Sequence, residues 1–549
     1  MKKIVSLFIS IFILAACSES FLDENPVGEL SPEQILNPQN VEGTIISAYS
    51  VLNGQIDEAS NAYNSPASNW SFGDVVSDDA YKGGGGTGDQ NQIHLMEIFA
   101  TTPSTIRDVE RKWLALYEGI RRTNLSIRLL NESKDFDSNL KNQRIGEMRF
   151  LRGHFHFEAK KIYGNICWID ENIVTKDDFY QVSNSDLSDA EQWAKIEDDF
   201  KAAIQFLPDN QDDIGRATKM AATAYLAKCY LFQKKWDEVA ALTDDVINSK
   251  KYSLEPNFRD VFLAENDNGS EIIFAVQHSI NDGSPENFNG SIGDRLLAPG
   301  GPYSSYGFLR PSQNLVNAYK TDANGLPLND GTNVIPEDNV DPRIDHTLAR
   351  PGIPYLDIQV YNWTPREASV YGPYSPKKRL LSINSPYFLP IWPYITALNY
   401  YIIRYADILL WRAEAAIELD DLETGRKYIN MVRSRAETGG YVKTMDGTSD
   451  ASNYAIGTYD LTFASKEAAI DALRTERRLE FAHEGHRFFD LVRWGFASEV
   501  MNKYLESEKL FRSHLTNAVF VKGKNEYQPI PQTQMDLSQS DMVQNPGYN

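Results

Sequence analysis

Helical periodicity is the feature that most constrains how this chain of 549 residues can fold. Apolar side chains recur every three to five residues over most of 106–250 and 402–495, and a shorter run covers 41–52. Such spacing places these side chains on one face of an α-helix. The helices follow one another in pairs, such as 218–248 and 402–435, whose length is close to the roughly 34 residues of a tetratricopeptide-like unit. The pattern predicts a mainly α fold in which stacked helix pairs form a scaffold.

Two long segments lack this periodicity. Residues 53–102 are rich in Asn, Asp, Ser and Gly and include the run Gly83 to Gly86. Residues 280–399 are rich in Pro, Gly and Asn, and the stretch 300–405 holds twelve of the 28 tyrosines together with Trp363 and Trp392. Long segments without regular structure are usually functional or disordered. We therefore expect loop-rich ligand-binding parts, the second of them a large insertion in the helical frame.

The first 16 residues have the layout of a signal peptide. Lys2 and Lys3 precede an uncharged apolar run, and Leu14-Ala15-Ala16 leads to Cys17. The run is shorter than the roughly 20 residues that a membrane-spanning helix needs. Leu-Ala-Ala-Cys resembles a bacterial lipobox, which predicts cleavage after residue 16, a lipid on Cys17 and a tether over 17–40. The alternative is an ordinary secretory signal with an incidental cysteine.

The amino-acid composition limits which binding partners this chain can have. The net charge is -22, and removal of 1–16 takes away two lysines and no acid. An acidic surface opposes binding to nucleic acid or anionic lipid headgroups, so no nucleic-acid partner is expected. Only Cys167 and Cys229 follow Cys17. Their apolar contexts favour two buried free thiols, with a disulfide as the alternative.

Motifs for catalysis, metals and phosphate are missing or distorted. His483 and His486 are three residues apart, whereas a zincin needs two histidines four apart on one helical face. His154 and His156 are two apart and lie on different helical faces. Gly83 to Gly86 lacks the Lys-Ser/Thr ending of a phosphate-binding loop, and there is no Gly-x-Ser-x-Gly elbow. The sequence therefore predicts no metal site, no cofactor and no catalytic residues.

Glu476, Glu480 and Glu484 recur at helical spacing among several arginines. Residues four apart lie on the same face of a helix and can form ion pairs. We interpret this cluster as a structural ion-pair network on one helix.

The aromatic loops are the remaining candidate for a functional site. A sugar ring has apolar CH faces and a rim of hydroxyls, so proteins bind it with Trp or Tyr rings and neighbouring polar side chains. The alternative for any single aromatic is that it packs against the scaffold. The predicted ligand-binding residues are Asn69, Trp70, Asp78, Asp79, Tyr81, Lys82, Tyr303, Tyr306, Trp363, Tyr371, Tyr374 and Trp392.

Several stretches together resemble the SusD/RagB family of Bacteroidetes outer-membrane lipoproteins. The matching residues are Cys17 with Phe21-Leu22-Asp23 and Pro26, Leu116-Tyr117-Glu118-Gly119-Ile120 with Asn124, 148–153 with Tyr163-Gly164, 403–410 with Ala413-Glu414-Ala415, 476–481, 484–495 and 544–548. One departure is visible at Gly164-Asn165-Ile166-Cys167-Trp168, where many members have a proline soon after the glycine.

The resemblance implies a fold of four tetratricopeptide-like helix pairs that support a loop-rich ligand-binding part, covering 41–549. It implies a non-catalytic lid on a SusC-like TonB-dependent transporter, anchored in the outer membrane and exposed at the cell surface. Such proteins capture nutrients, usually glycans, through loops that vary between members, so no ligand residue is transferred by motif.

Three functions stay open on the sequence alone. The favoured one is a surface lipoprotein that binds oligo- or polysaccharide and delivers it to the transporter. The second keeps the scaffold but binds peptides or another nutrient. The third, a surface hydrolase, has the least support because the catalytic motifs are missing.

Overall fold

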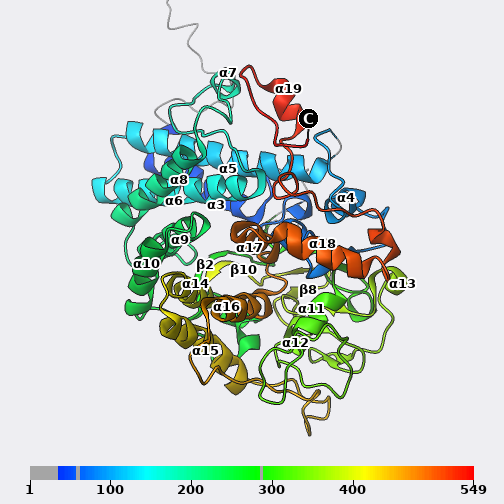
Figure 1. Ribbon diagram of the computed structural model, residues 1–549. Helices are drawn as coiled ribbons and strands as arrows, with labels where there is room; N and C mark the ends of the chain where they lie inside the picture. The colour runs from blue at the N-terminus through cyan, green and yellow to red at the C-terminus, as the bar shows by residue number, and fades with distance from the viewer. Residues whose placement is uncertain (1–34, 57–61, 105, 285–288, 393, 549) are drawn as a thin grey trace, which may run out of the picture.

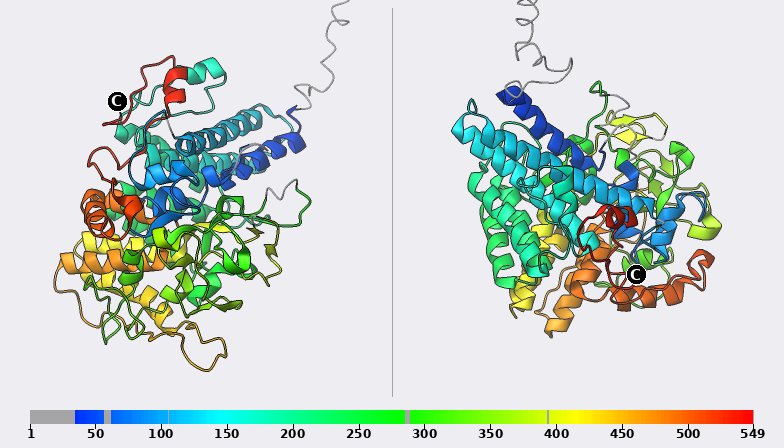
Figure 2. Two further views of the ribbon diagram at one scale, coloured as in Figure 1. Left: turned by 90° about the vertical axis from the view of Figure 1, so that its right-hand side faces the viewer. Right: turned by 90° about the horizontal axis from the view of Figure 1, so that it is seen from above.

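The structure is a computed structural model that describes residues 35–56, 62–104, 106–284, 289–392 and 394–548. Cys17 and the signal peptide predicted over 1–16 lie outside the described residues. Figure 1 shows a stack of helices beside a region built mainly from loops, and the turned views of Figure 2 show the same division. Within the described residues, no helix is both long and apolar enough to cross a membrane.

The helical scaffold is a row of helices in which neighbours along the chain pack against each other. Its members are α3 (Pro38–Ser50), α5 (Arg107–Glu132), α6 (Ser138–Tyr163), α8 (Asp189–Phe206), α9 (Lys219–Phe232), α10 (Trp236–Asn248), α14 (Tyr405–Glu418), α15 (Leu422–Thr438) and α16 (Lys466–Phe481). The mainly helical fold agrees with the prediction. Helix α3 begins at Pro38, so the last residues of the expected tether 17–40 are helical.

Side-chain caps define where several of these helices begin. The Asp137 carboxylate accepts hydrogen bonds from the backbone N–H groups of Asn139 and Leu140, so α6 begins at Ser138. Ser188 and Glu191 form a capping box at the start of α8. These caps satisfy N–H groups that have no partner inside the helix.

A two-stranded ribbon separates the scaffold from the loop-rich insertion. Strands β2 (Ile272–Val276) and β10 (Tyr400–Arg404) pair antiparallel, so the chain leaves and re-enters the scaffold at neighbouring points. The sequence predicted a helix from Ile402, and this is wrong for residues 402–404. Ile403 pairs with Phe274 and both are buried, because β-branched residues suit a covered strand.

The two loop-rich segments form one unit. Strand β1 (Ala80–Gly83) pairs antiparallel with β3 (Phe308–Pro311), which joins the first segment to the second. Trp70, Phe308, Tyr355 and Tyr361 belong to a hydrophobic core that is separate from that of the scaffold. The short elements of this unit are α4 (Asn91–Glu97), α11 (Gln313–Ala318), α12 (Ile344–Thr347), α13 (Ala368–Tyr371), β4 (Leu348–Ala349), β5 (Pro354–Tyr355), β6 (Gln359–Val360), β7 (Ser375–Pro376), β8 (Phe388–Leu389) and β9 (Ile395–Thr396).

The C-terminal part covers the junction between scaffold and loops. Helix α16 ends at Phe481, and two further helices follow, α17 (Arg487–Trp494) and α18 (Ala497–Glu508). The last helix of the described residues is α19 (Gln532–Leu537). Another short helix, α7 (Lys176–Tyr180), lies between α6 and α8 in sequence. The Asn545 side chain donates hydrogen bonds to the carbonyls of Tyr163 and Gln528, which ties the tail to α6.

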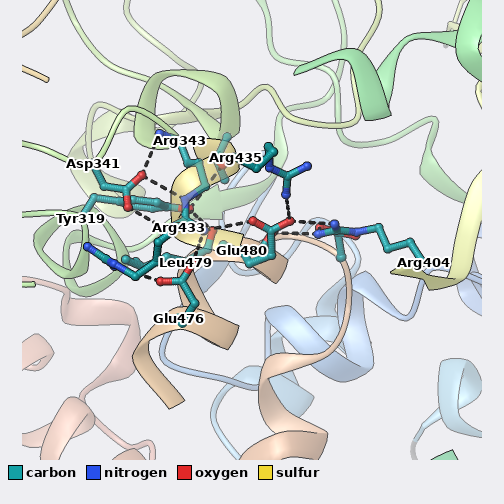
Figure 3. A network of polar contacts seen from close by, with 12 residues as sticks. Tyr319, Asp341, Arg343, Arg404, Arg433, Arg435, Glu476, Leu479 and Glu480 are labelled. Atoms are coloured by element: carbon teal, nitrogen blue, oxygen red, sulfur yellow. Dashed lines mark hydrogen bonds and ion pairs between the residues drawn. The ribbon is translucent and has the colours of Figure 1, made fainter. Parts of the chain in front are cut away.

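A buried ion-pair network joins the scaffold to the insertion (Figure 3). Glu480 of α16 pairs with Arg343 at 3.0 Å, Arg404 at 2.7 Å and Arg435 at 2.5 Å. Glu476 pairs with Arg343 at 2.6 Å. The structural interpretation of these glutamates is confirmed. Their partners, however, come from the insertion, β10 and α15 rather than from one helix, and Glu484 lies beyond the end of α16.

Both cysteines in the described residues are buried free thiols, as the sequence favoured. Burial also raises the pKa of the Cys167 thiol to about 12. Neither side chain is poised to react as a thiolate at neutral pH.

Candidate ligand-binding site

Asp78 and Asp79 are buried ion-pair partners of the helical scaffold. Arg487 donates to both carboxylate oxygens of Asp78, at 2.8 and 3.0 Å, and Arg478 donates to Asp79 at 2.7 Å. Burial acts to raise the pKa of Asp78, but Arg478 and Arg487 outweigh it and hold that pKa at about 2. These two residues join the first loop-rich segment to α16 and α17, which leaves neither exposed to a ligand.

Asn69 and Trp70 also support the fold. Trp70 begins a π-helical turn, Trp70–Asp74, and its fully buried indole donates to the carbonyl of Gly293 at 3.0 Å. The Asn69 amide donates to Glu158 of α6 at 2.9 Å. Both side chains are buried, and each donates a hydrogen bond inside the protein.

Tyr81 and Lys82 of β1 are buried as well. The Tyr81 hydroxyl donates to Glu508 at 2.5 Å. The Lys82 ammonium donates to the carbonyls of Gly86 at 2.8 Å and Asp89 at 2.5 Å, and burial lowers its pKa to about 8. Lys82 therefore holds the glycine run in place and does not point outward as a ligand-binding side chain would.

Three of the predicted tyrosines pack inside the protein, Tyr371 of them against the core of the scaffold. Tyr303 and Tyr371 are buried, and the Tyr303 hydroxyl donates to the carbonyl of Leu381 at 2.5 Å. Tyr374 is half-buried and donates to Gln313 at 3.1 Å. These three follow the alternative considered for single loop aromatics, which is packing against the rest of the protein, because burial of an aromatic ring is favourable.

Tyr306, Trp363 and Trp392 remain partly or fully exposed. Trp392 lies in the turn of the β8–β9 hairpin with 67% of its surface exposed, and its indole N–H donates to the carbonyl of Ser304 at 3.1 Å. Its ring lies 4.9 Å from that of Tyr306 at an angle of 43°. Trp363 is half-buried and packs against Tyr361.

Two charged residues that were not predicted from the sequence act electrostatically on Tyr306. The Arg366 guanidinium lies 3.6 Å from the Asp89 carboxylate, which also accepts the Gly85 N–H at 2.8 Å. Partial burial raises the pKa of Tyr306. Among its charged neighbours Arg295 opposes this rise most, and Asp89 and Arg366 act more weakly in opposite directions. We call Tyr306, Trp392, Asp89 and Arg366 the aromatic face. Asp89 follows the glycine run closely, and that was the signal available for it.

Gly85 allows Arg366 to lie where it does. A Cβ atom at residue 85 would come within 2.2 Å of the Arg366 guanidinium. The bare backbone thus brings the cation against the loop that carries Asp89. The resulting pair offers hydrogen-bond donors and acceptors side by side, which is what vicinal hydroxyls of a sugar require.

A separate surface groove of about 680 Å³ lies between α15 and residues 252–254. None of the predicted ligand-binding residues lines it. Arg426 and Asn430, two of its polar residues, already donate to the carbonyl of Tyr459. The chemistry of this groove is less suited to a sugar than that of the aromatic face.

Comparison with known families gives two matches that together cover most of the chain. Residues 270–548 match the SusD family, and residues 20–231 match a family described as starch-binding and associating with the outer membrane. Among curated proteins, SusD-like protein P25 of Formosa agariphila is 24% identical, with all of both chains covered. A SusD-like protein of Bacteroides ovatus is 23% identical and also matches the whole of this chain and 97% of its own.

Solved structures share the fold. A laminarin-binding SusD-like protein superposes with a TM-score of 0.71 at 24% identity, covering 93% of this chain and 100% of that one. Surface glycan-binding protein A of Bacteroides thetaiotaomicron, in complex with laminarihexaose, gives 0.69 at 20% identity, covering 92% and 99%. The family match spans half of the chain and bears out the predicted resemblance to binding proteins without catalytic activity. The chain belongs to the SusD family.

Proposed function

We propose that this protein binds glycans through the aromatic face, without catalysis, and delivers them to a SusC-like TonB-dependent transporter. The observation that carries the proposal is the exposed Trp392 ring, fixed by its bond to Ser304 and placed against Tyr306. An exposed indole held in one orientation is suited to stacking on the CH face of a sugar. The relatives that bind laminarin and laminarihexaose support a glucan as the first ligand to test.

The membrane part of the proposal rests on the N-terminal sequence and the family. A lipid on Cys17 would anchor the protein in the outer membrane at the cell surface. Each buried CH₂ of such a lipid contributes about 0.8 kcal/mol, and stable anchoring needs more than one acyl chain. The family match to proteins associating with the outer membrane supports this location.

Isothermal titration with laminarihexaose, followed by a panel of other oligosaccharides, tests glycan binding. Trp392→Ala is expected to weaken binding at least tenfold, equivalent to about 1.4 kcal/mol. Phe511→Ala is a matched control, because Phe511 is a similarly exposed aromatic (75%) outside the aromatic face. If wild-type protein binds a glycan and Trp392→Ala binds it equally well, the aromatic face is not the site. If no oligosaccharide binds, the glycan proposal fails.

A separate experiment tests the membrane anchor and the association with a transporter. Full-length protein is expected to fractionate with the outer membrane and to co-purify with a TonB-dependent transporter identified by mass spectrometry. Cys17→Ser should release the protein from the membrane fraction. Co-purification with the transporter but binding of a peptide instead of a sugar would favour the second function.

A further inference from the structure

A groove of about 260 Å³ lies between α3 and α5, close to the point where the described chain begins. Beside it the two helices are joined by hydrogen bonds from the Ser126 hydroxyl to Thr44 at 3.0 Å and from Arg122 to the Ser47 carbonyl at 3.0 Å. The lining residues are Ile35, Asn40, Gly43, Thr44, Ser47, Arg121, Arg122 and Leu125. Ile35, the first described residue, is therefore part of the groove.

The α3 side of the groove exposes bare backbone. Gly43 lies in the interior of α3 and is exposed, and among the described residues no atom lies within 4 Å of the place that a Cβ would take. Glycine inside a helix is destabilising relative to alanine, and the described packing gives no reason for it here. Ile46, three residues further along the helix, is 57% exposed. This side is suited to a partner that packs closely against the helix.

The α5 side of the groove is positively charged. Arg121 and Arg122 both pair with Glu118, each at 2.7 Å, so the three side chains carry one positive charge in excess. The Arg121 side chain is 62% exposed, and half-buried Leu125 also lines the groove. The groove therefore offers an apolar contact beside a cation, which fits a segment with apolar and acidic side chains.

The chain itself has such a segment directly before the groove. Residues 18–34 contain five acidic side chains and no lysine or arginine, and Phe21-Leu22 is followed at once by Asp23-Glu24. The family match to proteins associating with the outer membrane starts at residue 20, so it includes this segment instead of beginning at α3. A spacer that only has to be long enough would not need a shared sequence pattern.

The length and composition of the segment allow it to reach the groove. Residues 23–34 separate Phe21-Leu22 from Ile35 and span at most about 40 Å when extended, whereas Ile35 itself lines the groove. The stretch between them must therefore reverse its direction. Its sequence contains Pro26, Gly28 and Pro32, which are residue types that favour turns.

We propose that Phe21-Leu22 docks in the groove, with Asp23-Glu24 facing Arg121, so that this segment forms a strap across α3 and α5. The strap does not depend on glycan binding. It also changes how far the body can move from the lipid of the proposed function. Only residues 18–20 then separate Cys17 from the docked segment, a reach of at most about 14 Å, compared with about 60 Å if 18–34 were a free spacer. The strap would keep the α3–α5 face close to the membrane.

Cysteine cross-linking in the whole protein tests the strap. Ser20→Cys is combined with Ser47→Cys in the groove, a short bismaleimide joins the two thiols, and peptide mass spectrometry identifies the product. Ser20→Cys with Glu132→Cys is the matched control. Glu132 is exposed at the end of α5, next to Ser133, whose hydroxyl donates to the Leu36 carbonyl at 2.9 Å, so a free segment would reach it as easily as the groove. The groove pair is expected to cross-link about tenfold more than the control pair.

A variant of the groove gives a second measurement. Gly43→Asp places a carboxylate on the bare backbone, where the space is open, and aspartate is less unfavourable than glycine inside a helix, so the variant should fold. It is expected to lower cross-linking of the groove pair about tenfold, because it fills the contact and repels the acidic segment. Gln39→Asp, at an exposed position of α3 outside the groove, should leave the yield unchanged.

The strap is overturned if the groove pair cross-links no better than the control pair, or if Gly43→Asp leaves its yield unchanged. It is also overturned if Ser47→Cys in whole cells cross-links to another protein instead of to residue 20, since a partner would then occupy the groove. Membrane fractionation reports separately on the lipid. A protein that cross-links at the groove but is not bound to the membrane retains the strap and contradicts only the anchor of the proposed function.

Discussion

At the scale of single residues, the sequence shows which charged side chains lie in the loop-rich segments, but it does not show whether they bind a ligand or support the fold. Asp78, Asp79 and Lys82 were singled out as sugar ligands because they are charged groups among loop aromatics. Each is buried and bonded within the protein. The partners of Asp78 and Asp79 lie 409 and 399 positions away in sequence, so local composition could not reveal them, whereas those of Lys82 are four and seven positions away.

Asp78 predicts an acid-sensitive contribution to stability. Its folded pKa of about 2 lies below the unfolded value near 3.9, so the contribution is complete above pH 4 and is lost as pH falls through 2. The size is about 2 kcal/mol. When the pH is lowered from 5 to 2, the free energy of unfolding should therefore decrease less for Asp78→Asn than for wild type. Denaturant titrations at each pH measure this free energy.

The same variant should be destabilised at pH 7, because it leaves Arg487 buried without its carboxylate partner, at a cost of about 3–5 kcal/mol. Asp177→Asn is the control, since Asp177 is exposed in the first turn of α7. Equal pH slopes in Asp78→Asn and wild type would contradict this account.

At the scale of elements, the long helices were predictable and the strands were not. An apolar stripe with a period near 3.6 is a local signal, and α5, α9 and α10 lie close to where it predicts them. Strand β10 pairs with β2, whereas α18 carries an apolar stripe of Ala497, Met501, Tyr504 and Leu505 that the prediction missed. Short paired elements depend on their partners, which the local pattern does not contain.

Alanine substitutions at two glycines, Gly485 before α17 and Gly495 after it, are expected to destabilise the protein to very different extents. Gly485 has a φ of +78°, and a Cβ there would lie 2.0 Å from the carbonyl oxygen of Ser68. Gly495, at the end of α17, has a φ of +84° with nothing within 4 Å. Gly495→Ala should cost about 1 kcal/mol, from backbone strain alone.

Gly485→Ala has the same backbone strain, and its Cβ would also push the backbone at Ser68 away. Its loss of stability should therefore be several times that of Gly495→Ala. Thermal unfolding of the two variants measures the difference. Similar melting temperatures for both would show that the contact between Gly485 and the 68–74 turn is not tight.

At the scale of the whole molecule, the ion-pair network couples the scaffold to the insertion. Glu480 accepts from Arg343 of the insertion, Arg404 of β10 and Arg435 of α15, all buried (Figure 3). Glu480→Gln should lower the free energy of unfolding by about 3–5 kcal/mol, because it leaves buried guanidinium groups without their carboxylate.

Chemical denaturation measures this effect, and Glu467→Gln is the matched control because Glu467 lies exposed in the first turn of the same helix. The control should unfold close to wild type. A Glu480→Gln protein that also unfolds close to wild type would mean that the network contributes little to stability.

The sequence by itself determined the helical scaffold, the loop-rich insertion and the resemblance to the family, because helical periodicity, composition and ordered motifs are local properties of the chain. Only the tertiary structure decided which loop aromatics face solvent. It placed Trp70, Tyr303 and Tyr371 in an interior and left Trp392 outside beside Tyr306, and it paired Asp89 with Arg366 across the loops. The reason is physical: an aromatic ring gains free energy from burial wherever a neighbour can cover it, and the neighbours are set by β1–β3 pairing between segments more than 200 residues apart.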